Sequence, residues 1–108
     1  MDINNRNIQT GMPIKIISTL RRRISALTRG DAFFKIGITS NPSSRASQYG
    51  DEYDEMVVLY QKTSNRFVRK LETVLIEEYW EHCDNKIGGG GGQIGSAPYY
   101  LYIVRDID

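Results

Sequence analysis

The chain has 108 residues, of which 40% are hydrophobic and 25% charged, a composition typical of one globular domain and not of a disordered chain. It contains no run of about 18 apolar residues and its first nine residues are polar, so the sequence predicts no membrane span and no secretion signal, and favours the cytoplasm. The single Cys83 and the single His82 beside it exclude an internal disulfide and are too few ligands for a structural zinc site.

Charge is spread unevenly along the chain. Residues 1–48 carry a net charge of +6 and residues 49–108 a net charge of −5, which together give the +1 of the whole chain. A basic half beside an acidic half suits an anionic partner such as DNA, and it equally suits association between copies of the chain. Both interpretations stay open at this stage.

A polar arm and a basic helix are predicted at the start of the chain. Residues 1–12 have no apolar periodicity, so we expect a flexible arm. From Pro13 to Gly30 the apolar residues follow one helical stripe, and a strand that begins near Ile14 is the competing prediction. Four arginines surround the stripe and are candidates for contacts with nucleic-acid phosphates, with a solvated helix face as the alternative: Arg21, Arg22, Arg23 and Arg29.

A strand, a short helix and a second strand come next. Residues 33–39 are apolar on both faces, which predicts a central strand, and Gly37 within it indicates close approach by a neighbouring segment or a ligand. The sequence Ser40-Asn41-Pro42 then caps a short helix that ends near Tyr49. Residues 56–60 predict the second strand.

The rest of the chain predicts a long helix, a glycine loop and a third strand. Ser64 or Asn65 caps the helix, which reaches about His82. Five consecutive glycines at 88–92 predict a flexible connector, with a backbone nest for phosphate as the alternative. Residues 99–104 form the third strand candidate. The order of elements predicts a small α/β (α+β) domain with a three-stranded mixed sheet flanked by helices.

The segment from Phe34 to Arg45 resembles the second motif of the GIY-YIG nuclease superfamily. In a phage-type branch this motif reads Lys-Ile-Gly and is followed by a threonine, a proline and, on the next helix, an arginine; the matching residues here are Lys35-Ile36-Gly37, Thr39, Pro42 and Arg45. The strand at 56–60 and the helix that carries Glu72 also match in order and spacing. The resemblance covers residues 33 to about 82 and implies a small DNA endonuclease of phage or mobile-element origin that depends on Mg²⁺ or Mn²⁺.

The first motif of the family, a strand with Gly-Ile-Tyr, is missing before Phe33, where the sequence predicts a basic helix instead. The strand at 99–104 resembles this missing strand. Two interpretations follow: a circular permutation that places the first strand last, or a plain C-terminal strand in a divergent member. The permutation requires residues 100–104 to lie beside residues 33–39.

The resemblance also implies roles for individual residues. Arg45 would bind phosphate through its planar, permanently charged guanidinium, and Glu72 would hold one metal ion. Tyr100 or Tyr102 would be the general base under the permutation, and Tyr49 otherwise. Lys35 stands where the family often has a second tyrosine, and would orient water or phosphate.

Simpler interpretations remain beside these roles. Arg45 also fits a surface cation, and Glu72 also fits a helix ion pair with Arg69 or Lys70. A catalytically inactive protein that binds nucleic acid or a nucleotide on the same scaffold is the second functional hypothesis, favoured by the missing tyrosine motif. The third is an oligomeric interaction protein, such as a phage inhibitor of a host defence protein, in which the acidic helix of one copy meets the arginine-rich helix of another.

Overall fold

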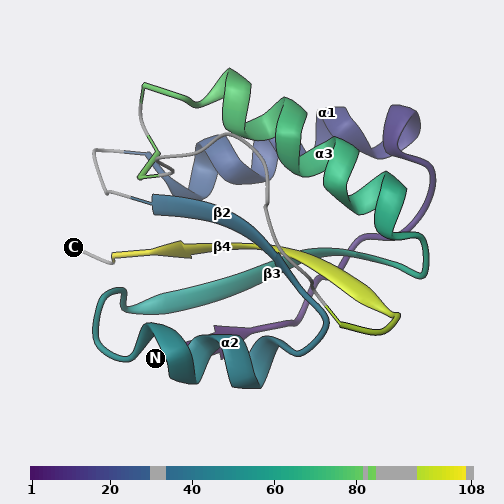
Figure 1. Ribbon diagram of the computed structural model, residues 1–108. Coiled ribbons are helices and arrows are strands. Elements are labelled where there is room, and N and C mark those ends of the chain that lie inside the picture. The colour runs from purple at the N-terminus through teal and green to yellow at the C-terminus, as the bar shows by residue number, and fades with distance from the viewer. Residues whose placement is uncertain (30–33, 82, 85–94, 107–108) are drawn as a thin grey trace.

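The computed structural model describes residues 1–29, 34–81, 83–84 and 95–106. Within these residues the chain forms three helices and a four-stranded mixed sheet in one α/β domain. In chain order the elements are β1 (Asp2–Asn4), α1 (Pro13–Leu27), β2 (Phe34–Thr39), α2 (Pro42–Tyr49), β3 (Glu55–Lys62), α3 (Asn65–Glu78) and β4 (Tyr99–Arg105) (Figure 1). The five-glycine run lies outside the described residues. Among the described helices, none combines the length and the apolar composition that crossing a membrane requires.

The last strand of the chain lies in the middle of the sheet. The strand order is β1-β3-β4-β2, and β4 pairs antiparallel with both β3 and β2. The register with β2 runs from Thr39 opposite Tyr100 to Phe34 opposite Arg105. The strand predicted at 99–104 is therefore adjacent to the strand predicted at 33–39, as the permutation requires.

The prediction of a three-stranded sheet is wrong, because the expected flexible arm contributes a fourth strand. β1 pairs parallel with β3, with Ile3 opposite Met56. Further along the arm, the Gln9 amide donates to the Leu59 carbonyl at 2.8 Å, and the Gln61 amide donates to the Gln9 carbonyl at 2.9 Å. Such pairing uses backbone groups, which every residue has, so a short polar strand leaves no signal in the side-chain pattern.

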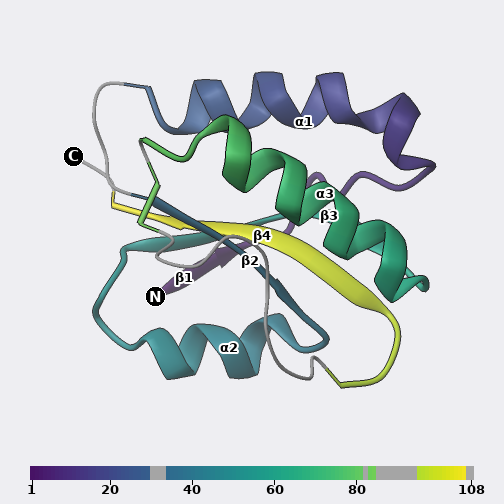
Figure 2. The same ribbon diagram turned by 45° about the horizontal axis from the view of Figure 1, so that its top comes forward.

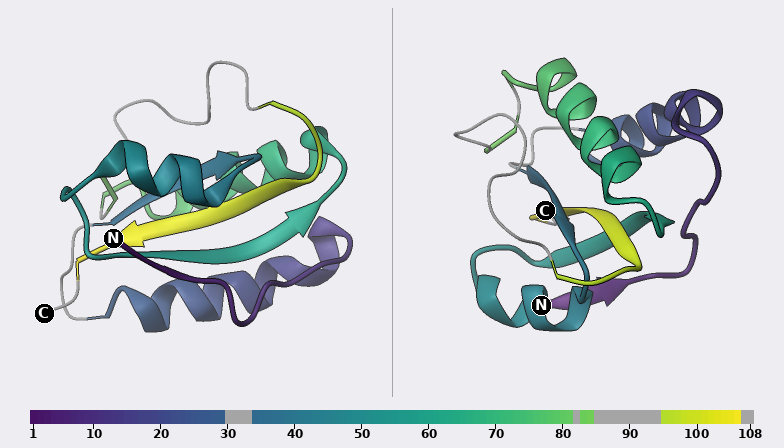
Figure 3. Two further views of the ribbon diagram at one scale, coloured as in Figure 1. Left: turned by 90° about the horizontal axis from the view of Figure 1, so that it is seen from below. Right: turned by 45° about the vertical axis from the view of Figure 1, so that its right-hand side comes forward.

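The helices cover the two faces of the sheet unequally. Helices α1 and α3 lie on one face and α2 lies on the other (Figures 1 and 3). Because side chains alternate along a strand, Ile36 and Ile38 of β2 pack in the core beneath α1 and α3, while Lys35, Gly37 and Thr39 face the α2 side. In β4, Tyr102 and Val104 pack on this α2 side as well.

The ends of the helices follow local capping rules. Helix α1 begins at Pro13 as predicted, so the competing strand near Ile14 is wrong. Helix α2 begins at Pro42, and the Asn41 side chain accepts a hydrogen bond from the Ser44 amide at 3.1 Å. Ser64, one of the two predicted caps, caps α3 in the same way by accepting a hydrogen bond from the Phe67 amide.

Candidate functional site

The α2 face of the sheet gathers four of the residues that the sequence analysis singled out. Lys35 comes from β2, Arg45 and Tyr49 from α2, and Tyr102 from β4. Strand alternation brings Lys35 and Tyr102 to the same face, and the antiparallel register places Tyr102 opposite Gly37, two pairs along from Lys35. Arg45 and Tyr49 are four residues apart on α2, so both lie on one side of that helix.

Tyr102 is the buried centre of this group. Its side chain is fully buried, its hydroxyl lies 2.8 Å from the Tyr49 hydroxyl, and an Nη atom of Arg45 donates to it at 3.4 Å. Burial raises the pKa of the Tyr102 hydroxyl well above its usual value, and the Tyr49 hydroxyl raises it further, while Arg45 acts in the opposite direction. Tyr102 therefore stays protonated and orients Arg45 and Tyr49, a poor match for the general base expected at this position.

The close approach predicted at Gly37 is confirmed, and the neighbour is Tyr102. The two residues lie directly opposite each other in β2 and β4. A Cβ atom on Gly37 would stand 2.4 Å from the Tyr102 hydroxyl oxygen and 2.5 Å from Cζ of its ring. Only glycine leaves room for the ring here, so the Lys-Ile-Gly motif makes the space that holds Tyr102 against Arg45.

Tyr49 is the more accessible tyrosine of the group. It is half-buried, and its ring packs edge-on against those of Tyr53 and Tyr102. The ammonium of Lys35 lies 5.7 Å from the centre of the Tyr49 ring, within the range of a cation–π contact. The second tyrosine proposed from sequence, Tyr100, lies on the same face opposite Thr39 and Gln61, towards the start of α2.

A polar hollow of about 190 Å³ lies beside Arg45 at the N-terminal end of α2. Its lining consists almost wholly of hydroxyl, amide and guanidinium groups: Thr39, Ser40, Asn41, Ser44, Arg45, Gln48 and Gly95. The positive end of the helix dipole and the Arg45 guanidinium favour an anion at such a position, whereas the Ser44 amide is already bonded to the Asn41 cap. The hollow is several times the volume of one water molecule and has room for a phosphate group.

Sequence reasoning missed most of this lining. Ser40 was predicted only as part of the cap of the short helix, and Ser44 and Gln48 were given no role. Gly95 was assigned no part in a site, although its backbone has φ of 86° and a Cβ atom there would stand 2.4 Å from Oγ of Ser40. The signal in the sequence was the density of hydroxyl residues around the single arginine of a short helix.

Glu72 lies in a different layer from Arg45. It belongs to α3, on the opposite face of the sheet from α2 (Figure 1), and its exposed fraction is only 4%. Mg²⁺ keeps several of its waters when it binds protein and so needs a carboxylate that faces solvent. The placement of Glu72 does not fit such a site. Within the described part of the chain, no three His, Cys, Asp or Glu side chains are grouped to hold a metal ion.

The arginines proposed to bind nucleic acid divide into two kinds. Arg21 donates to Glu78 at 2.8 Å, and Arg23 donates to the carbonyl oxygens of Asn7 and Leu59. Burial lowers the pKa of Arg23. Arg23 thus attaches the N-terminal segment to the sheet. Arg22 and Arg29 are exposed, but α1 lies on the face opposite to α2, so they do not form one surface with Arg45 (Figure 3).

Comparisons with models of known protein families, with curated proteins and with solved structures find no significant match to this chain. The arrangement of the residues on the α2 face is therefore the basis for the function proposed below.

Proposed function

We propose that this protein is a small DNA endonuclease on a GIY-YIG-like scaffold, and that the hollow beside Arg45 binds a phosphate of the DNA backbone. One observation carries the proposal. Strand β4, which is distant in sequence, pairs with β2 and places Tyr102 opposite Gly37 and within reach of Arg45. The pairing supports the interpretation that β4 takes the place of the missing Gly-Ile-Tyr strand in a permuted chain.

The chemistry of phosphodiester cleavage assigns a task to each member of the group. Negative charge develops on the phosphate oxygens as water attacks, and the Arg45 guanidinium with the positive end of the α2 dipole would stabilise it. The Tyr102 hydroxyl accepts a hydrogen bond from one Nη atom of Arg45 and so restricts the orientation of the guanidinium. This fixed orientation matters because catalysis by charge stabilisation depends on groups that are already in place.

Tyr49 is the residue we propose to act as the general base: its phenol first loses its proton to solvent, and the resulting phenolate then accepts a proton from the attacking water. It is more accessible than Tyr102, whose hydroxyl can donate a hydrogen bond to the Tyr49 oxygen. Because the buried Glu72 does not fit a hydrated Mg²⁺ or Mn²⁺ site, no step of this proposal passes through a metal ion.

Nicking of a supercoiled plasmid tests the proposal. The protein is incubated with Mg²⁺, with Mn²⁺ and with EDTA, beside Arg45→Ala and the control Arg66→Ala, which removes an exposed arginine from the opposite face. We expect Arg45→Ala to reduce nicking by about 100-fold or more and Arg66→Ala to leave it unchanged. Equal nicking by Arg45→Ala and the wild type would refute the role of the hollow.

A protein that binds DNA phosphates without cleaving them is the second candidate, and the buried Glu72 favours it. In that case a fluorescent DNA duplex binds at low salt and no nicked plasmid forms under any of the three conditions. Arg45→Ala would then weaken binding about tenfold or more, because it removes a charged hydrogen bond to phosphate.

A further inference from the structure

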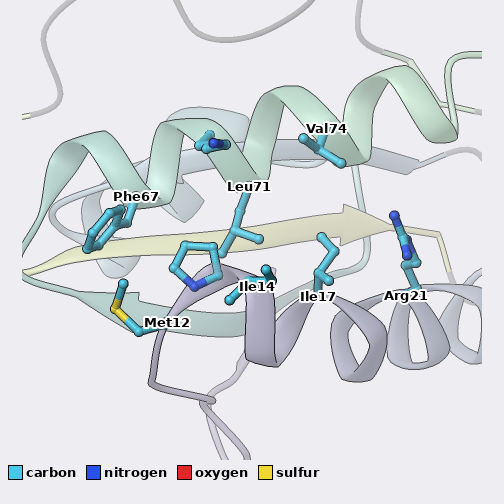
Figure 4. Close-up of a pocket in the computed structure, with 9 residues that line it drawn as sticks. Met12, Ile14, Ile17, Arg21, Phe67, Leu71 and Val74 are labelled. Carbon is cyan, nitrogen blue, oxygen red and sulfur yellow. The ribbon is translucent and has the colours of Figure 1, made fainter.

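Helices α1 and α3 form a face whose two ends differ. They lie side by side and run in the same direction (Figures 2 and 4). Along their C-terminal halves they are joined by the Arg21–Glu78 ion pair and by a hydrogen bond of 2.8 Å between the side chains of Ser25 and Tyr79. At their N-terminal ends they leave a groove of about 400 Å³.

The groove is apolar, and side chains at its margin are exposed. Its apolar lining comes from the two helices and the residues just before α1: Met12, Pro13, Ile14, Ile17, Phe67, Leu71 and Val74 (Figure 4). Ile14 is 84% exposed and Met12 is 44% exposed. These two side chains adjoin the apolar groove, and a continuous apolar surface of this kind marks an interaction site.

The charges along α3 show which partner fits this face. Arg66, Lys70, Thr73 and Glu77 follow one another at helical spacing and are all exposed. The basic residues lie in the first turns and Glu77 lies in the last turn, which is opposite to the preference of the helix dipole. A second α3 laid antiparallel would place acidic side chains beside the basic end of the first, and basic ones beside its acidic end.

We propose that this face binds a second copy of the chain in a symmetric antiparallel dimer. The two-fold axis passes near Thr73, so Lys70 of one copy meets Glu77 of the partner subunit, and the apolar groove with Ile14 is covered. In a two-fold interface each contact occurs twice, so one self-complementary row of side chains along α3 is sufficient to form the dimer. The α2 face with the Arg45 hollow stays exposed in both copies, so the dimer does not depend on the proposed nuclease function.

The size of the face predicts a weak dimer. Helices of 14 and 15 residues are about 21–23 Å long, and two of them together are about 20 Å wide. A face of that size is at the lower limit of specific protein interfaces. We therefore expect a monomer–dimer equilibrium in the micromolar range, which shifts towards monomer at high salt because charged pairs contribute to it.

Sedimentation equilibrium from a few micromolar to about one millimolar tests the association. Ile14→Glu should raise the dissociation constant at least tenfold, and Gln48→Glu on α2 should not change it. Lys70→Glu and Glu77→Lys should each weaken the dimer, and the double variant should restore it. Circular dichroism confirms that each variant is folded. A wild-type chain that stays monomeric over the whole range would overturn the proposal.

Cysteine cross-linking tests the antiparallel arrangement independently. In a Cys83→Ser background, Thr73→Cys should form a disulfide-linked dimer under mild oxidation, since residue 73 lies next to its own copy across the axis. Arg66→Cys lies two helical turns, about 10 Å, from the axis and should not cross-link. Efficient linkage through position 66 with none through position 73 would contradict this arrangement.

Discussion

Gly37 of β2 lies directly opposite Tyr102 of β4, and the tyrosine hydroxyl occupies the place where a Cβ atom at position 37 would stand. Two segments that are far apart in sequence thus depend on each other for the same small volume. The glycine makes room for the ring, and the ring in turn contacts Arg45 and Tyr49. This mutual dependence can be measured as a coupling between substitutions.

Gly37→Ala should lower the free energy of unfolding by about 1–3 kcal/mol, the usual cost of overpacking a filled interior. Combined with Tyr102→Leu, which removes the ring atoms that clash, the alanine should cost clearly less. Urea denaturation of the two single variants and the double variant measures the coupling. Additive effects would show that the two side chains do not compete for this space.

Arg23 and Arg22 are neighbours in sequence but should respond differently to alanine. Arg23→Ala removes the charged donor from the carbonyl oxygens of Asn7 and Leu59, so we expect a loss of about 1.5–3 kcal/mol in the free energy of unfolding. Arg22 is exposed, and Arg22→Ala should change stability by no more than about 0.5 kcal/mol. Thermal denaturation distinguishes them, and equal losses would mean that Arg23 does not attach the N-terminal segment.

Stability should fall steeply in alkaline solution. Burial raises the pKa of Tyr53, Tyr60 and Tyr102, and a hydrogen bond to Asp84 raises that of Tyr53 further. Each of these tyrosines keeps its proton in the folded chain at a pH where the unfolded chain has lost it. Their contribution is therefore complete below about pH 10, the pKa of an unperturbed tyrosine, and is lost as the pH rises above it.

The magnitude can be checked residue by residue. Each such tyrosine should lower the free energy of unfolding by up to about 1.4 kcal/mol for each pH unit above pH 10. Urea denaturation between pH 9 and 11.5 gives the slope, and tyrosinate absorbance reports when the phenols ionise. Tyr102→Phe should make the slope shallower by one proton. An unchanged slope in this variant would mean that Tyr102 ionises freely in the folded chain.

The two tyrosines of the candidate site should also differ in activity. If Tyr49 accepts the proton, Tyr49→Phe should reduce plasmid nicking by about 100-fold or more, since general base catalysis contributes at least that much. Tyr102→Phe keeps the buried ring and loses only the hydrogen bonds that orient its neighbours, so a smaller reduction is expected. The opposite ranking would assign the base to Tyr102.

The positions of most elements could be predicted from the sequence because their signals are local. The proline and asparagine at the start of α2, and the serine before α3, act on backbone groups within one turn, and both helices begin where these residues predict. The apolar runs of β2, β3 and β4 are long enough for their length and composition to indicate strands. β1 has three residues and depends on pairing with β3, which is a long-range contact.

The candidate site was predictable only in part, since its geometry depends on how layers pack. Arg45, Tyr49, Lys35 and Tyr102 meet because strand register and helix direction bring them together, and the resemblance anticipated the adjacency of their strands. In the sequence, Glu72 follows the apolar Leu71 at the margin of the apolar side of its helix. This position does not show on which face of the sheet the helix packs. The rotation of α3 on the sheet decides that Glu72 is buried, and this rotation is set by core residues such as Leu71 and Leu75.

The central position of β4 has a consequence for how the chain folds as it is synthesised. Strands β2 and β3 leave the ribosome first, but neither is the neighbour of the other, and both need β4 between them. Until residues 99–105 emerge, these two apolar strands have open edges of the kind that promote aggregation. The joining of β2 to β3 therefore waits for β4, which is made after both, and nascent chains halted before residues 99–105 should be the ones that chaperones and proteases capture.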